Sequence, residues 1–163
     1  MLCFALIMLV AAAFSAFNAN KAHAADATAD DFKVASIGIR LQDNAAETGV
    51  RFGVQINEEL LNKADAKVTL YMLPQMFYVS GAHLNAGAAT AQSVEIPGTG
   101  WAGENGYKTA YAYVYDFPAN NYGVKLLAEA CLTYIENGAT VSKWTAVSDA
   151  YSLTDVAKIA QEG

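Results

Sequence analysis

Apolar and polar residues alternate along much of the chain with a period of two, the pattern of a β-strand that buries one face. Gly49–Ile56 is the clearest case, because every second residue from Val50 onward is large and apolar. Similar patterns predict further strands at Lys33–Leu41, Lys67–Leu73, Gln92–Pro97, Tyr107–Phe117, Val124–Ile135 and Ala139–Val147. We expect the first strand to pair antiparallel with Gly49–Ile56, which would bring Arg40 near Arg51.

The stretch from Lys108 to Tyr134 is the centre of the predicted fold. Its first strand places large aromatic residues on one face, namely Tyr111, Tyr113 and Tyr115, and small apolar residues on the other, namely Ala110, Ala112 and Val114. Pro118 ends this strand, because proline has no N–H to give to a sheet. The returning strand carries Leu126, Ala128, Ala130, Leu132 and Tyr134 on one face, and Lys125, Leu127, Glu129, Cys131 and Thr133 on the other.

Turn and helix signals separate the strands. The sequence Glu136-Asn137-Gly138 indicates a β-hairpin of the Asn-Gly type. Asn57–Lys63 predicts one or two helical turns capped by Asn57, and Ser152–Asp155 predicts the capped start of a helix that runs to about Gln161 with Val156 and Ile159 on its apolar side. Three stretches complete the reading: Ser80–Ala91 and Gly98–Gly106 are expected to be loops, and the apolar Gln75–Val79 to pair at a sheet edge.

Seven or eight short strands with turns between them predict one all-β domain, an antiparallel β-sandwich of immunoglobulin or jelly-roll type with a short C-terminal helix. We place this domain at residues 33–163, after a flexible lead at residues 25–32. Residues 1–24 have the apolar run and the Ala22-His23-Ala24 ending of a secretory signal peptide. The rival interpretation is an uncleaved anchor, but the apolar run is shorter than the roughly 20 residues that a membrane span needs.

Composition narrows the chemistry. The net charge of −6 argues against nucleic acid and anionic membranes as partners. After the predicted cleavage the chain keeps one histidine, His83, and one cysteine, Cys131, too few for a zinc site or an internal disulfide. Acidic and amide groups at Asp43, Asn44 and Glu47, or at Asp116, Asn120 and Asn121, could bind calcium, although they read equally well as turn residues.

Catalytic patterns are weak, and we expect no enzyme and no cofactor. The chain lacks a nucleophile elbow, an HExxH motif and a phosphate-binding loop. Glu95, Glu104 and Asp116 flank the loop around Trp101 and could converge as glycosidase carboxylates do. Arg40 and Arg51 could bind an anion, or could form a cross-strand pair that nearby acids neutralise.

Aromatic residues are the strongest candidates for a binding surface. Trp101 lies in a glycine-rich loop, and a row of tyrosines follows it closely in the sequence. The predicted ligand-binding residues are Trp101, Tyr107, Tyr111, Tyr113 and Tyr115. An exposed row of this kind would stack on sugar rings or meet a protein partner, whereas the alternative is that the three central tyrosines face the core or a covering loop.

Six segments carry a resemblance to a known group of proteins: ASIGIRL, TGVRFGVQI, LYMLP, VEIPGTGW, YVYDFPANNYGVKLLAEACLTY and SLTDVA. Together they resemble a β-rich module that is common in secreted and cell-surface proteins of gut Clostridia and related Firmicutes. The resemblance covers Lys33 to Ala157. It implies a bacterial surface or secreted location, and it implies no activity and no catalytic residue.

The sequence therefore predicts a non-catalytic extracellular binding module whose ligand is a polysaccharide or a surface protein. A structural spacer or adhesion module without a ligand of its own is the alternative, and a glycan-acting enzyme is the third. An exposed aromatic strip would favour binding, buried aromatics a spacer, and a cleft with two carboxyls at glycosidase separation an enzyme.

Overall fold

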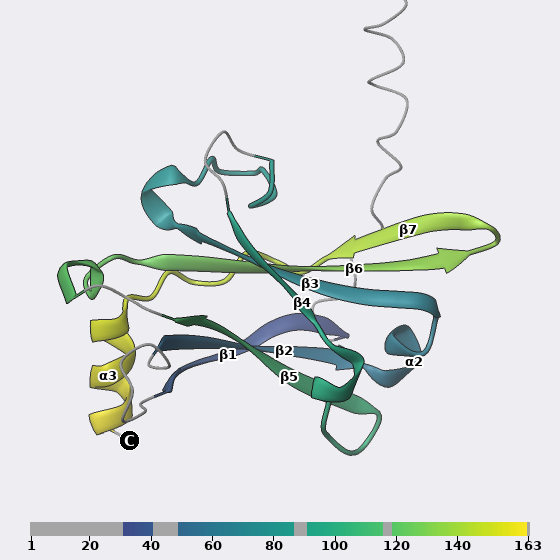
Figure 1. The fold of residues 1–163 in the computed structure, drawn as a ribbon, viewed down its shortest axis with the longest axis horizontal. Coiled ribbons are helices and arrows are strands. Elements are labelled where there is room, and N and C mark those ends of the chain that lie inside the picture. The colour runs from purple at the N-terminus through teal and green to yellow at the C-terminus, as the bar shows by residue number, and fades with distance from the viewer. Residues whose placement is uncertain (1–30, 41–48, 87–90, 116–118, 163) are drawn as a thin grey trace, which may run out of the picture.

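A computed structural model describes residues 31–40, 49–86, 91–115 and 119–162. The predicted signal peptide, most of the predicted lead, the loop before Gly49 and residues 116–118 lie outside this description. In the described part, seven strands form two antiparallel sheets that pack face to face (Figure 1). The three-stranded sheet has the order β1-β2-β5, with β1 at Phe32–Arg40, β2 at Gly49–Asn57 and β5 at Tyr107–Tyr115. The four-stranded sheet has the order β4-β3-β6-β7, with β3 at Ala64–Pro74, β4 at Gln92–Ile96, β6 at Leu126–Glu136 and β7 at Ala139–Trp144.

The prediction of an all-β antiparallel sandwich is confirmed. If the strands are lettered A to G in chain order, the two sheets are ABE and DCFG. A constant-type immunoglobulin domain has ABED and CFG, so here the fourth strand pairs with the third instead of the fifth. The strand order thus differs from that of a constant-type immunoglobulin domain in the sheet to which the fourth strand belongs.

The core lies between the two sheets, and the period of two explains its composition. On β2 the expected inward residues are all buried: Val50, Phe52, Val54 and Ile56. On β5 the small residues face the core, because Ala110, Ala112 and Val114 are buried while Tyr111 is 46% exposed. The alternative that Tyr111 faces the core is therefore wrong, and this ring lies on the outer face of the three-stranded sheet.

The first strand departs from the prediction in two ways. It begins at Phe32, which the sequence pattern assigns to the flexible lead, and this side chain is only 1% exposed. The register also shifts between Val34 and Ser36, so that Ala35 is an extra residue in the ladder. A bulge of this kind changes which residues share a face. Val34 and Ile37 both pack against the core, whereas Ser36 lies opposite Gly53 on the outer face.

Both faces of β6 are buried over its first half. The inner face behaves as predicted, with Leu126, Ala128, Ala130, Leu132 and Tyr134 all buried. The opposite face is covered by the loop after β3, whose Leu84 packs with Leu73 of β3 and Leu127 of β6 in a second, smaller apolar cluster. Gln75–Phe77 forms a 3-10 turn, so the expected edge strand at Gln75–Val79 is wrong.

The turns and caps follow the sequence closely. Asn137 and Gly138 form the hairpin turn with φ angles of 52° and 78°, as an Asn-Gly turn requires. Helix α2 (Glu58–Leu61) is capped by Asn57, whose side chain accepts a hydrogen bond from Glu59 N–H. Helix α3 (Leu153–Glu162) covers one end of the sandwich (Figure 1). Its Val156 is buried, but Ile159 is 54% exposed, so only part of the predicted apolar side is covered.

Candidate functional site

A pocket of about 420 Å³ lies beside Trp101, at the side of the sandwich where the chain passes from β4 to β5. Trp101 is half-buried and packs against the core, so its indole ring is held in place. The polar groups of the pocket are the side chains of Asn62, Lys67 and Glu95. Among the described residues, neither Lys67 nor Glu95 forms an ion pair. The pocket thus combines a fixed aromatic wall with an amide, an ammonium and a carboxylate.

Three separate elements build this Trp101 pocket. Asn62 caps the end of α2, Lys67 follows the irregular start of β3, and Glu95 lies near the end of β4. Trp101 follows the 3-10 turn Gly98–Gly100, and the next residue forms an antiparallel bridge with Thr109 of β5. The sequence indicates Trp101 and Glu95 as candidates but gives no sign of Asn62 and Lys67. Their approach depends on the turn of chain through α2, which no local pattern reports.

The outer face of the three-stranded sheet carries a second aromatic surface. Tyr111 lies directly opposite Gly53 in the register. A side chain at Gly53 would collide with Ser36 Oγ, and its Cβ would lie 3.0 Å from Tyr111 Cε1. The absence of a side chain at Gly53 therefore gives the tyrosine ring room to lie across the strand.

Arg51 lies against Tyr111 on this face. Its guanidinium carbon is 4.8 Å from the centre of the Tyr111 ring, within the range of a cation–π contact. A Cβ at Gly38, the residue opposite Arg51, would be 2.7 Å from Arg51 Nε. The predicted Arg40–Arg51 pair is not directly opposed, because the register pairs Arg40 with Gly49 and Gly38 with Arg51.

The predicted aromatic residues thus divide into two groups. Trp101 closes one side between the sheets, while Tyr111 lies on the outer face, so the structure does not give one continuous strip. Tyr107 is half-buried, and its hydroxyl lies 3.5 Å from Asp31 Oδ1. Tyr113 is half-buried opposite Arg51. Tyr115 is the last residue of β5, and its side chain lies outside the description.

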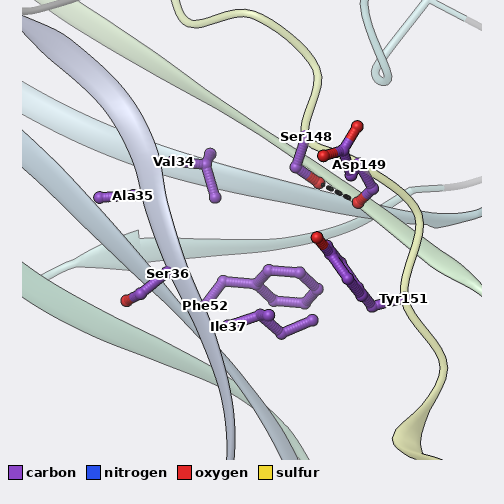
Figure 2. A pocket seen from close by; sticks show the side chains of 8 residues that line it. All are labelled: Val34, Ala35, Ser36, Ile37, Phe52, Ser148, Asp149 and Tyr151. Carbon is purple, nitrogen blue, oxygen red and sulfur yellow. Dashed lines mark hydrogen bonds between the residues drawn. The ribbon is translucent and has the colours of Figure 1, made fainter. Parts of the chain in front are cut away.

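A smaller groove of about 210 Å³ follows the free edge of β1 (Figure 2). Phe52 and Ile37 lie on one side of the Tyr151 ring, and the Tyr151 hydroxyl points toward Ser148 and Asp149 (Figure 2). Ser148 Oγ donates a hydrogen bond to the Asp149 carbonyl, 2.9 Å away. The groove is smaller than the roughly 300–1,000 Å³ of ligand pockets in general, and we assign it no ligand.

A buried carboxylate fastens the loop that follows β3 onto the four-stranded sheet. Glu129, on β6, is only 2% exposed. Its Oε2 accepts a hydrogen bond of 2.8 Å from Leu84 N–H, and its Oε1 lies 2.6 Å from His83 Nδ1. The His83 ring stacks on Trp144, with 4.1 Å between ring centres. The arrangement satisfies the carboxylate and orders the loop, and we call it the Glu129 latch.

The latch also explains the state of the cysteine. Burial, and then the negative charge of Glu129, raise the pKa of the Cys131 thiol from its usual 9.0 to about 11. At neutral pH the thiol is therefore protonated and a poor nucleophile. Cys131 owes this low reactivity to its buried position on the covered face of β6.

The positions of the described residues give little support for a catalytic or metal-binding site. Glu95 and Glu104 are exposed, and Asp116 lies outside the described residues, so the possible convergence of these three carboxylates stays a prediction. Within that part, no group of three or more His, Cys, Asp or Glu side chains could hold a metal ion. The Asp43, Asn44 and Glu47 cluster lies outside it as well. No described helix is both long and apolar enough to cross a bilayer.

Comparisons with protein families, with curated proteins and with solved structures found no match for this chain.

Proposed function

We propose that the protein is a non-catalytic saccharide-binding module that acts outside the bacterial cell. The observation that carries this proposal is the Trp101 pocket, in which an aromatic wall meets Asn62, Lys67 and Glu95. The location rests on the signal-peptide pattern of residues 1–24 and on the resemblance to secreted bacterial modules. Sequencing of the exported protein should find Ala25 as its first residue, whereas an uncleaved N-terminus would favour the membrane-anchor alternative.

The chemistry of the pocket suits a sugar ring. A pyranose has an apolar face of C–H groups that can lie on an indole, and hydroxyls around its rim that both donate and accept hydrogen bonds. Asn62 can donate and accept, Lys67 donates, and Glu95 accepts. Because Trp101 packs against the core, little side-chain freedom is lost when a ligand stacks on it.

Fluorescence can test this proposal if one complication is removed. The chain has two tryptophans, and Trp144 stacks on His83 far along the sequence from the pocket. In the variant Trp144→Phe, Trp101 is the sole tryptophan and reports on the pocket alone. We expect a saturable change in its emission when a soluble neutral plant, mucin or cell-wall polysaccharide binds.

The matched control is Trp101→Phe, in which Trp144 is the sole tryptophan. The same titration should leave the emission of Trp144 unchanged, and Trp101→Ala should abolish binding measured by calorimetry. A flat response of the folded Trp144→Phe variant to the whole panel would refute saccharide binding at Trp101. It would favour a spacer or protein-adhesion role.

A further inference from the structure

We propose that the outer face of the three-stranded sheet is a second binding site, which recognises a saccharide bearing a single carboxylate through Arg51 and Tyr111. The proposal rests on the proposed function only for the ligand class, because the residues differ from those of the Trp101 pocket. The face is described by four positions: Gly38, Arg51, Gly53 and Tyr111.

Arg51 supplies the positive charge of the site. Among the described residues no acidic side chain forms an ion pair with it, although the protein as a whole carries a net charge of −6. Its contact with the Tyr111 ring holds the guanidinium in place without neutralising it. A guanidinium in this state favours a carboxylate, which it can bind through two parallel hydrogen bonds.

Tyr111 supplies the apolar surface beside that charge. One edge of its ring lies over Gly53, Arg51 lies over the ring, and 46% of the residue remains exposed. In a uronic acid the carboxylate is bonded directly to the sugar ring, so a C–H face and a negative charge are adjacent in one residue. Such a residue can place its carboxylate at Arg51 and rest its C–H face on the part of Tyr111 that Arg51 leaves exposed.

Gly38 and Gly53 leave the space that the Arg51 and Tyr111 side chains occupy on this face. A methyl group at Gly38 would meet Arg51 Nε at 2.7 Å, and one at Gly53 would meet both Ser36 and Tyr111. Each glycine therefore clears space for one member of the Arg51–Tyr111 pair. The net charge of −6 opposes a dense polyanion, so the site favours an isolated carboxylate over a nucleic acid or a polyuronate.

The test uses an oligosaccharide with one carboxylate, namely xylotriose carrying a single glucuronic acid, and the methyl ester of the same molecule. Titration into the ¹⁵N-labelled protein should shift the backbone amide signals of Gly38, Gly53 and Tyr111. The ester should bind with an affinity lower by on the order of tenfold, because it cannot make the charged hydrogen bonds. Because this comparison uses the wild-type protein, it does not depend on whether a variant folds.

Variants assign the effect to Arg51. Arg51→Gln should remove the difference between acid and ester, while Lys158→Gln, which makes the same charge change on exposed α3, should preserve it. Gly38→Ala should weaken acid binding by displacing Arg51 without removing any polar group. Trp101→Phe should leave acid binding intact, so failure of the Trp101 pocket and failure of this site are distinguishable.

Three results would overturn the proposal. Equal affinities for acid and ester would show that the charge of Arg51 is not used. Signal shifts confined to residues of the Trp101 pocket would place the oligosaccharide elsewhere. Binding of an aspartate-rich peptide at Arg51 without binding of the acidic oligosaccharide would make the face a protein-docking surface.

Discussion

Glu129 shows what the alternation of side chains can predict about a buried residue and what it cannot. The sequence LLAEACLTY correctly predicts that Glu129 lies on the face of β6 opposite the main core. It gives no sign that this face is also covered, since the covering loop comes from beyond β3, about 45 residues away in the sequence. The available signal was an acid two residues before a cysteine, within the apolar first half of the strand. The same limit applies to Asn62 and Lys67 beside Trp101.

Removal of the Glu129 carboxylate should unfasten the loop. Glu129→Ala leaves Leu84 N–H and the His83 ring without their acceptor, and we expect the free energy of unfolding to fall by about 1–3 kcal/mol. Glu129→Gln should cost less, because its amide oxygen can still accept from Leu84 N–H. Urea unfolding measures both, and hydrogen exchange at the Leu84 amide should accelerate in the alanine variant. Equal stability of the two variants would contradict the role given to the carboxylate.

Cys131 should make the stability of the protein fall in alkaline solution. Its pKa is raised in the folded state from 9.0 to about 11, so the unfolded chain loses this proton first as the pH rises. The contribution is therefore complete below about pH 9 and is lost as the pH rises toward 11. Its full size is on the order of 2 kcal/mol.

Other groups titrate in the same range, so the measurement is a difference. Denaturant unfolding of the wild type and of Cys131→Ala should be followed from pH 8 to roughly pH 11. The wild type should lose more stability over this range than the variant does. Parallel curves would mean that the thiol titrates alike in the folded and unfolded states.

At the scale of elements, turns and helix caps could be predicted from neighbouring residues, whereas the bulge in the first strand could not. The Asn137-Gly138 hairpin and the Ser152–Asp155 cap depend on neighbouring residues, and both form as predicted. The bulge at Ala35 leaves no comparable trace, because Val34 and Ile37 are both apolar and fit either phase of the pattern. At Gln75–Phe77 apolar composition suggested a strand, but the residue before it is a proline that also ends β3.

The hairpin turn can be tested with two glycines that both face open space. Gly138 has a φ of 78°, whereas Gly98 has no left-handed φ, and neither would place a Cβ within 4 Å of another residue. Gly138→Ala should lower the free energy of unfolding by about 1–2 kcal/mol, because an L-residue is strained in this conformation. Gly98→Ala should have little effect on thermal unfolding. Similar losses in both variants would show that the turn conformation is not the cause.

For the whole molecule, the sequence predicted a β-sandwich, but it did not predict the order of the strands within the two sheets. Alternation predicted the strands and their buried faces, and hairpin signals predicted the pairing of β6 with β7. The pairings of β2 with β5 and of β3 with β6 join strands that are distant in the sequence. No local pattern reports them, so the placement of the fourth strand with the third was not foreseen.

The inclusion of Phe32 in the folded unit is a prediction at this scale. Phe32 is 1% exposed, its strand pairs with β2, and Asp31 C=O accepts a hydrogen bond of 2.7 Å from Asn57 N–H. Phe32→Ala should therefore lower the free energy of unfolding by about 3–5 kcal/mol. Phe77 is 53% exposed, and Phe77→Ala is the matched control with little expected loss. Equal melting temperatures of the two variants would place Phe32 outside the cooperative unit.

The two ends of the described chain lie at opposite ends of the sandwich (Figure 1). Phe32 pairs with Ile56 beside α2, and the chain leaves through α3 at the far end. A force that pulled these ends apart would act along β1, at right angles to its hydrogen bonds with β2. Those bonds would have to break together instead of one after another, so the first strand acts as a mechanical clamp.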